Sequence, residues 1–323
     1  MLRTILQRLV QSIVVIVLMS FVVYMLIGLM PGDPIDLMIS SDPRINAEDA
    51  ARLRAAYGLD KPITERYLAW ATNALHGEFG YSRLFGRPVI ELMAPRLFNT
   101  FLLMISSWLI AVIFGLTLGT IAAARTGGAI DAGVNALAFI SASTPTFWLA
   151  LLLIILFAVN LQILPASGFP ISGSALDRVR HLVLPVMTLA IFETGVYARH
   201  MRAAMLEALN ADHVRTARAK GASRIRVIAV HAFRNAMIPV TTVMALGFGT
   251  QFSGALITET MFAYPGMGKM IFDSVMGNDF NLALVGLLFA TAMTLLANLA
   301  ADLAYVMLDP RISFAARSAG AGR

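Results

Sequence analysis

The amino-acid sequence predicts an all-α membrane protein with six transmembrane helices. The 323-residue chain is 58% hydrophobic and only 14% charged, whereas soluble domains carry about 25% charged residues. A helix of about 20 apolar residues crosses about 30 Å of hydrocarbon, and segments of this kind recur along the chain. They lie at 10–30, 98–124, 136–159, 182–198, 238–258 and 282–307.

The distribution of Lys and Arg sets the expected orientation in the membrane. With the N-terminus inside, the inner segments hold fourteen basic residues and the short outer loops hold three. The long outer stretch at 31–97 holds eight more beside nine acidic residues, but loops beyond about 60 residues largely escape the positive-inside rule. We therefore expect both termini to be cytoplasmic.

The first segment is expected to remain as a transmembrane helix within residues 1–30. Its apolar run from Leu9 to Met30 is longer than the core of a signal peptide, which has about 7–15 residues. No cleavage site of small residues follows it.

Residues 31–97 predict a small helical extracytoplasmic domain. Asn46 can cap a helix that ends at Gly58. Pro62 suits the first turn of a second helix, which would end near Gly77. The stretch is either a plain linker or a cap that docks or gates on the outer face.

The second and third segments carry signs of close packing and of a bend. Gly115 and Gly119 form a Gly-x3-Gly pair, which lets helix backbones approach closely, either inside one bundle or at a dimer seam. Pro145 is expected to kink the third segment because proline removes a backbone hydrogen bond, and nearby Ser and Thr side chains can bond the freed carbonyl.

The fourth and sixth segments contain ionisable residues, which are expensive inside a membrane. Glu193 lies in the fourth segment, which we expect to continue past the membrane, and Asp302 lies in the sixth, one turn after Asn298. These three side chains are candidates for lining a pathway or for an interhelical bond at a subunit seam. The alternative is a structural bond within the bundle or an interfacial position.

The basic loop at 199–237, which joins the fourth and fifth segments, has an unusual layout. Helical spacing over 211–219 puts Val214 and Ala217 on one side. Gly221 is expected to end this helix in a left-handed conformation, before a second helix leads into the fifth span. The charge alone fits binding to anionic lipid, worth about 1 kcal/mol per basic residue. The helix–Gly–helix layout favours docking of a protein partner that pushes a short, rigid helix.

Motifs for catalysis are missing from the sequence. It contains no Gly-x4-Gly-Lys-Ser/Thr phosphate loop, no His-Glu-x-x-His and no Gly-x-Ser-x-Gly. It has no cysteine, and its five histidines lack metal-ligand spacing. We expect no catalytic, cofactor-binding or metal site, and no nucleic-acid partner, because the basic residues lie beside membrane spans.

The basic loop also carries a family resemblance. Asp212-His-Val-Arg-Thr-Ala-Arg-Ala-Lys-Gly221, followed by His231-Ala-Phe-Arg-Asn-Ala-Met-Ile-Pro239, resembles the cytoplasmic signature of the dipeptide/oligopeptide/nickel permeases of ATP-binding-cassette (ABC) importers. Shorter motifs fall in the family's order: Pro31-Gly-Asp-Pro34, Tyr57-Gly-Leu-Asp-Lys-Pro62, Gly77-Glu-Phe-Gly-Tyr-Ser82, Leu164-Pro-Ala-Ser-Gly168 and Leu308-Asp-Pro-Arg-Ile312. The start and the enlarged outer loop resemble the first of the two permease types that these importers pair.

The departures from the family pattern are small. Broader importer permeases have Glu-Ala-Ala where this chain has Arg215-Thr216-Ala217, an aromatic Tyr is usual at His213, and Asp is common at Glu78. They leave open which loop residues contact the ATPase.

The resemblance implies a type I importer permease fold in a bacterial inner membrane. It implies a second homologous permease, two ATPase subunits that hydrolyse ATP, a periplasmic substrate-binding protein and membrane lipid as partners. Coupling to the ATPase would run through residues 207–226. The implied coupling residues are Asp212, Arg215, Thr216, Ala217, Lys220 and Gly221.

The resemblance favours dipeptides or oligopeptides as substrate, with nickel, glutathione and sugars as alternatives among relatives. The expected parts are an N-terminal helix at 1–30, an outer loop domain at 31–97, a five-helix core at 98–310 and a disordered tail at 311–323. A self-sufficient secondary transporter or channel is the alternative class, and it predicts inverted repeats, none of which the sequence displays. An intramembrane enzyme would need a constellation of catalytic residues that the sequence lacks.

Overall fold

A computed structural model describes residues 2–29, 61–170 and 173–308, with side chains described for 6–29, 61–170 and 173–300. Within these residues every regular element is a helix. Contacts divide the chain into two compact units: unit 1 comprises Met1–Leu97 and Met270–Met293, and unit 2 comprises Phe98–Lys269 and Thr294–Arg323. The predicted helix at 46–58 and the predicted tail at 311–323 lie outside the described residues.

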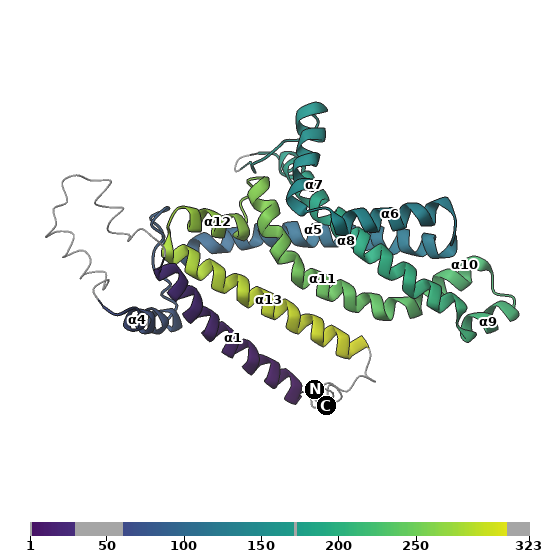
Figure 1. Cartoon of the computed structure of the whole chain (residues 1–323), viewed down its shortest axis with the longest axis horizontal. Helices are drawn as coiled ribbons and strands as arrows, with labels where there is room; N and C mark the ends of the chain where they lie inside the picture. Colours follow the sequence, from purple (N-terminus) through teal and green to yellow (C-terminus); the bar gives the residue numbers. More distant parts are fainter. Residues whose placement is uncertain (1, 30–60, 171–172, 309–323) are drawn as a thin grey trace. The chain divides into compact units, whose positions relative to one another are not determined.

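Five described helices are long and apolar enough to cross a membrane, and a bent pair makes a sixth if it counts as one span. The long helices are α1 (Leu2–Gly28), α5 (Val89–Ala124), α8 (Ala175–Asn210), α11 (Phe233–Met261) and α13 (Phe280–Leu308) (Figure 1). The bent pair consists of α6 (Ala129–Ser143) and the helix that runs from Thr146 to Asn160, as α7 (Thr146–Leu153) and then the π-helix η1 (Ile154–Asn160). The prediction of six apolar segments is thereby confirmed, with the third segment broken in the middle.

The break in the third segment is larger than the predicted kink. The two helices meet at 110°, because Thr144 and Pro145 both adopt an extended backbone between them. Proline disfavours the helical conformation in the residue before it and cannot donate a backbone hydrogen bond. The Thr144 hydroxyl donates to the Ile140 carbonyl at 2.7 Å, and the Thr144 amide donates to the same carbonyl at 3.0 Å. The carbonyl freed by Pro145 would be that of Ser141, four residues earlier, so the predicted bond of a Ser or Thr side chain to the freed carbonyl stays a prediction.

Helix α8 extends the predicted fourth segment at both ends. It begins at a capping box in which the Ser174 hydroxyl accepts from the Asp177 amide and the Asp177 carboxylate accepts from the Ser174 amide. Its most apolar stretch is 61% buried, the largest share among the spans, and it packs against α6, α7 and α11. Helix α8 is therefore the central helix of unit 2.

The glycine pair of the second segment packs inside the chain, against α8. A Cβ atom built on Gly115 would lie 2.6 Å from the Tyr197 Cβ, and one built on Gly119 would lie 2.7 Å from the Met201 Cβ. Ordinary carbon contacts lie at about 3.5–4.0 Å. Of the two expected uses, this pair serves close packing within one bundle in this structure.

Unit 1 contains the second helix predicted for the outer domain, α4 (Ile63–Leu75), whose N-cap is Pro62. Its rings pack on α1: Tyr67 lies edge-on to Tyr24, 5.6 Å between centroids, and stacks on Trp70 at 6.3 Å. The turn-rich stretch after α4 is fastened by Asp279, which accepts from the Ser82 hydroxyl at 2.5 Å and also caps the start of α13.

Candidate functional site

The structure has the predicted helix–Gly–helix layout in the loop between α8 and α11 (Figure 1). Helix α9 (Asp212–Ala219) is followed by α10 (Arg224–Arg226) and the π-helix η2 (Val227–Ala232), which runs into α11. Gly221 has φ +80°, and its amide donates to the Arg218 carbonyl while the Ala222 amide donates to the Ala217 carbonyl. This pair of bonds is a Schellman motif, which needs a left-handed residue after the helix and so favours glycine.

Helix α9 has one buried side and one exposed side. Val214 is 0% exposed and Ala217 8%, and Val214 belongs to a core cluster with Met205, Ala208 and Val227. The other coupling candidates are all exposed: Asp212, Arg215, Thr216, Lys220 and Gly221. The helix is thus anchored to α8 and η2 by its apolar side and presents a polar side outward.

Local polar contacts also fix α9. The Arg215 guanidinium lies 3.4 Å from the Asp212 carboxylate, and the Thr216 hydroxyl donates to the Asp212 carbonyl at 2.9 Å. The His213 Nε2 lies 3.0 Å from the Asn235 amide nitrogen, at the start of α11. Because the exposed ion pair is worth little, the buried side of α9 contributes most to its position.

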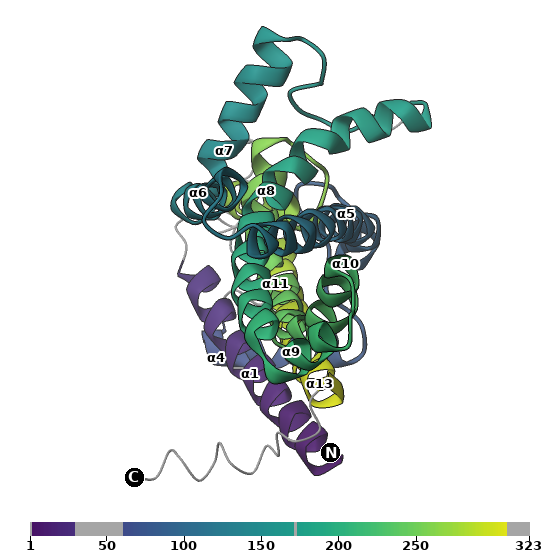
Figure 2. The same ribbon diagram turned by 90° about the vertical axis from the view of Figure 1, so that its right-hand side faces the viewer.

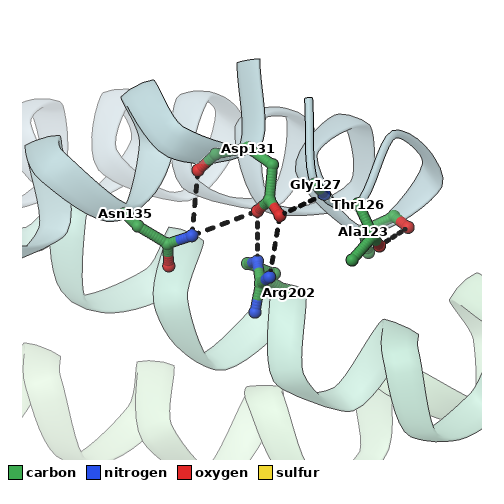
Figure 3. A network of polar contacts seen from close by, with 6 residues as sticks. All are labelled: Ala123, Thr126, Gly127, Asp131, Asn135 and Arg202. Carbon is green, nitrogen blue, oxygen red and sulfur yellow. Dashed lines mark hydrogen bonds and ion pairs between the residues drawn. The ribbon is translucent and has the colours of Figure 1, made fainter. Parts of the chain in front are cut away.

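A polar network lies close to this loop (Figure 3). The Asp131 carboxylate of α6 receives two bonds from the Arg202 guanidinium of α8, the Nη2 bond measuring 2.9 Å. It also accepts from the Gly127 amide at 2.9 Å and from the Asn135 amide nitrogen at 3.1 Å. Asp131 is 4% exposed, so four donors satisfy a buried carboxylate. The sequence alone assigns no role to Asp131, because only the fold brings Arg202 to it.

Two of the three pathway or seam candidates, Glu193 and Asn298, lie against α11. Glu193 of α8 is 6% exposed, and its Oε2 would lie 3.1 Å from a Cβ built on Gly247. Asn298 of α13 is exposed, and its Oδ1 would lie 3.2 Å from a Cβ built on Gly249. Because residues two apart point about 200° apart around a helix, Glu193 and Asn298 lie against different sides of α11. The side chain of Asp302 lies outside those that the structure describes.

A second buried carboxylate escaped sequence reasoning. Glu259, near the end of α11, is 0% exposed. It accepts from the Thr100 hydroxyl at 2.6 Å and from the Lys269 amide at 3.1 Å, in the first turn of α12 (Met267–Met276). A Cβ built on Gly268 would lie 3.0 Å from the Glu259 Oε2. An acid directly after an apolar segment and before Gly-x-Gly was the available signal. Among the described residues, no group of three or more His, Asp or Glu side chains could hold a metal ion.

Comparison with known proteins identifies the family. The family model described as "Binding-protein-dependent transport system inner membrane component" matches residues 115–314, and a model of the N-terminal part of such components matches residues 1–103. A putative peptide permease protein of Brucella suis is 37% identical, covering 97% of this chain and 99% of the relative. The oligopeptide transport system permease protein AppB of Bacillus subtilis is 35% identical, covering 96% and 99%.

A solved structure supports the fold. The crystal structure of an amino acid ABC transporter with histidines aligns with a TM-score of 0.52 at 16% sequence identity, covering 67% of this chain and 94% of that chain. The predicted fold class, an all-α type I importer permease, is confirmed. The prediction that the chain is a transport subunit and not an enzyme is also confirmed. The chain belongs to the family of binding-protein-dependent transport system inner membrane components, the permease subunits of ABC importers.

Proposed function

We propose that this chain forms half of the translocation pathway of an ATP-driven importer of dipeptides or oligopeptides. The family implies ATPase subunits and a substrate-binding protein as partners. The finer assembly that we propose contains a second homologous permease, two ATPase subunits and a periplasmic binding protein, in a bacterial inner membrane with both termini cytoplasmic. Relatives named as a peptide permease and an oligopeptide permease, both matched over nearly their whole length, support the substrate class.

The observation that carries the proposal is the two-sided helix α9. Its buried side chains, Val214 and Ala217, join it to the core around α8 and η2, while its polar side is free to meet another protein. A short helix packed in this way moves as a rigid body. In the proposed mechanism, closure of the ATPase subunits pushes α9, and the flanking connections pass the displacement to α8 and α11.

Each coupling candidate has a part in this proposal. Asp212, Arg215, Thr216 and Lys220 present charge and hydrogen-bond capacity to the ATPase surface. Ala217 keeps the buried side of α9 small enough for close approach to its neighbours. Gly221 lets the chain reverse directly after α9, because its φ of +80° suits glycine.

The pathway or seam candidates fit the same mechanism. Glu193 and Asn298 lie beside Gly247 and Gly249 of α11, the helix that η2 connects to the coupling helix. We propose that Glu193 and Asn298 are pathway or helix-seam residues on two different sides of α11, with Asp302 one turn beyond Asn298 on α13, and that their contacts adjust when α11 moves.

The test is recovery of the assembled complex from variants of α9. Ala217→Arg places a charge on the buried side, and Gly221→Pro cannot adopt the positive φ, so both should abolish co-purification of the ATPase subunits without loss of membrane insertion. Ala203→Arg, at an exposed position of α8, controls for an added arginine. Gly221→Asn, which tolerates the left-handed conformation, should retain docking. Normal recovery of the complex with both Ala217→Arg and Gly221→Pro would refute the coupling role.

The substrate class needs a separate experiment. The assembled importer in vesicles should accumulate a labelled dipeptide or oligopeptide only when ATP and the binding protein are present. ATP-dependent accumulation of Ni²⁺ or glutathione without peptide transport would refute the peptide assignment. Transport by the purified chain without any ATPase subunit would support a secondary transporter instead.

A further inference from the structure

Two arginines of the loop at 199–237 bind both sides of the turn between α5 and α6. We call residues 125–130, which end with the first two residues of α6, the α5–α6 turn; all six are exposed. The Arg224 Nη2 donates to the Ala124 carbonyl at 2.7 Å, directly before the turn. The Arg202 guanidinium binds the Asp131 carboxylate, directly after the turn. In Figure 2, α9 and α10 face the viewer, and the end of α5 lies beside α10.

The chemistry of the two helix ends explains the choice of arginine. The last carbonyls of α5 lack partners within the helix and carry partial negative charge, which favours a cation such as Arg224. The Asp131 carboxylate sits in the first turn of α6 and also accepts from the Gly127 amide, so it binds the turn itself to Arg202. A guanidinium can bind both carboxylate oxygens at once, which fixes geometry as well as distance.

Close packing behind the turn leaves little room for independent motion. Gly119 lies one and a half turns before the end of α5, and a Cβ built on it would lie 3.0 Å from the Arg202 amide nitrogen. Met201 and Ala198 of α8 are both 0% exposed. The α5–α6 turn is therefore tied to α8 on one side of α9 and to α10 on the other.

We propose that Arg224 and Asp131 are positioning residues that make the α5–α6 turn move together with α9 as one rigid body. The proposal rests on the proposed coupling function of α9, which it deepens by adding α5 and α6 to the elements that the ATPase moves. A displacement of α9 reaches α8 and α11 because the chain connects them to it. It then also reaches α5 and α6, through the bonds to Ala124 and Asp131. Without these bonds, ATP hydrolysis moves α9 while the turn lags behind.

The direct measurement is a distance between two spin labels in the assembled transporter. The chain has no cysteine, so Ala129→Cys in the first turn of α6 and Ala219→Cys at the end of α9 add two label sites on exposed positions. Cysteines of the partner subunits are replaced beforehand. Distances are recorded without nucleotide and with ATP trapped by vanadate, and transport per ATP hydrolysed is measured on the same preparations.

The parent pair should give one narrow distance that is the same in both nucleotide states. Arg224→Ala and Asp131→Asn should each broaden it, and their combination should broaden it most. Transport per ATP hydrolysed should fall roughly threefold in Arg224→Ala, since the bond is exposed, and further in the combination. Arg224→Lys keeps a donor and should stay close to the parent. Arg125→Ala removes an exposed charge from the same turn and leaves both bonds intact, so it is the matched control.

Several outcomes would overturn the proposal. A parent distance that changes between nucleotide states means that the turn moves independently of α9. A narrow, unchanged distance in Arg224→Ala, or equal losses in Arg224→Ala and Arg125→Ala, means that the bonds do not hold the turn. If Asp131→Asn fails to fold, the Arg224 variants alone decide. Failure of the proposed function is recognised separately, because the parent chain then fails to assemble with the ATPase or to transport peptide.

Discussion

The close packing of α5 on α8 leads to a quantitative prediction for Gly119→Ala. The added Cβ would lie 2.7 Å from the Met201 Cβ and 3.0 Å from the Arg202 amide nitrogen. Carbon contacts are normally about 3.5–4.0 Å, so the two helices must separate by roughly 1 Å. The neighbouring atoms belong to helix backbone or to Cβ positions, which cannot turn away as the end of a flexible side chain can.

The expected cost follows from two opposing effects. Overpacking a well-packed interior by a methyl group costs about 1–3 kcal/mol, while replacing a helical glycine with alanine gains up to about 1 kcal/mol in helix propensity. Gly133→Ala on α6 isolates the steric effect, because a Cβ there meets nothing within 4 Å. The free energy of unfolding should therefore be lower in Gly119→Ala than in Gly133→Ala by about 1–3 kcal/mol.

The assay is reversible unfolding of the purified chain in mixed detergent micelles, followed by tryptophan fluorescence. Trp108 of α5 lies edge-on to Phe248 of α11, 5.8 Å between ring centroids, and reports on this part of the bundle. Equal unfolding free energies for Gly119→Ala and Gly133→Ala would refute the reasoning, because α5 and α8 would then not be packed as closely as the structure has them.

Three further changes test other contacts. Glu259→Ala should destabilise unit 2, because the Thr100 hydroxyl and a backbone amide lose their acceptor. Each buried donor left without an acceptor costs about 1–3 kcal/mol. Glu259→Gln should lose less unfolding free energy, and unfolding in detergent measures both variants. Arg202→Met should destabilise the chain more than Asp131→Asn, because Arg202→Met leaves the buried Asp131 carboxylate without its cation. The order of the two melting temperatures checks this. Ser174→Ala should weaken the first turn of α8 by about 1 kcal/mol, seen as faster amide hydrogen exchange confined to that turn.

Each of these predictions has an outcome that would contradict it. Unfolding of Glu259→Ala at the parent's detergent concentration would mean that the carboxylate is not needed to hold the first turn of α12. A higher melting temperature for Arg202→Met than for Asp131→Asn would mean that the Gly127 and Asn135 amides stabilise the carboxylate sufficiently without Arg202. Unchanged exchange in Ser174→Ala would mean that the capping box is not formed.

The local features of the fold were predictable from the sequence because each depends on neighbours along the chain. Apolar run length indicated the membrane segments, and Pro145 marked the interruption of the third, since a proline acts on the residues beside it. Gly221 marked the end of α9 for the same reason. The extent of that interruption was underestimated, because the 110° bend depends on how α6 and α7 each pack in the bundle.

The contacts of the candidate site were less accessible. Helical spacing correctly placed Val214 and Ala217 on one buried side of α9, because that pattern is periodic. The bond of Arg224 to Ala124 joins residues 100 positions apart, and the bond of Arg202 to Asp131 joins residues 71 apart. Many arginines and several carboxylates compete for such pairings in a single sequence, so the partner could not be chosen.

By itself the sequence determined an all-α membrane protein with recurring apolar segments and a basic, glycine-broken loop, because length, composition and local periodicity are properties of short stretches. Its motifs, through their resemblance to a known family, indicated a permease. Only the tertiary structure decided what the polar and small residues contact. Gly115 and Gly119 meet α8, Glu259 meets Thr100, and Asp131 meets Arg202. The physical reason is that a buried carboxylate requires hydrogen-bond donors and a glycine allows a close helix contact. In both cases the partner is determined by the packing of helices that are distant in the sequence.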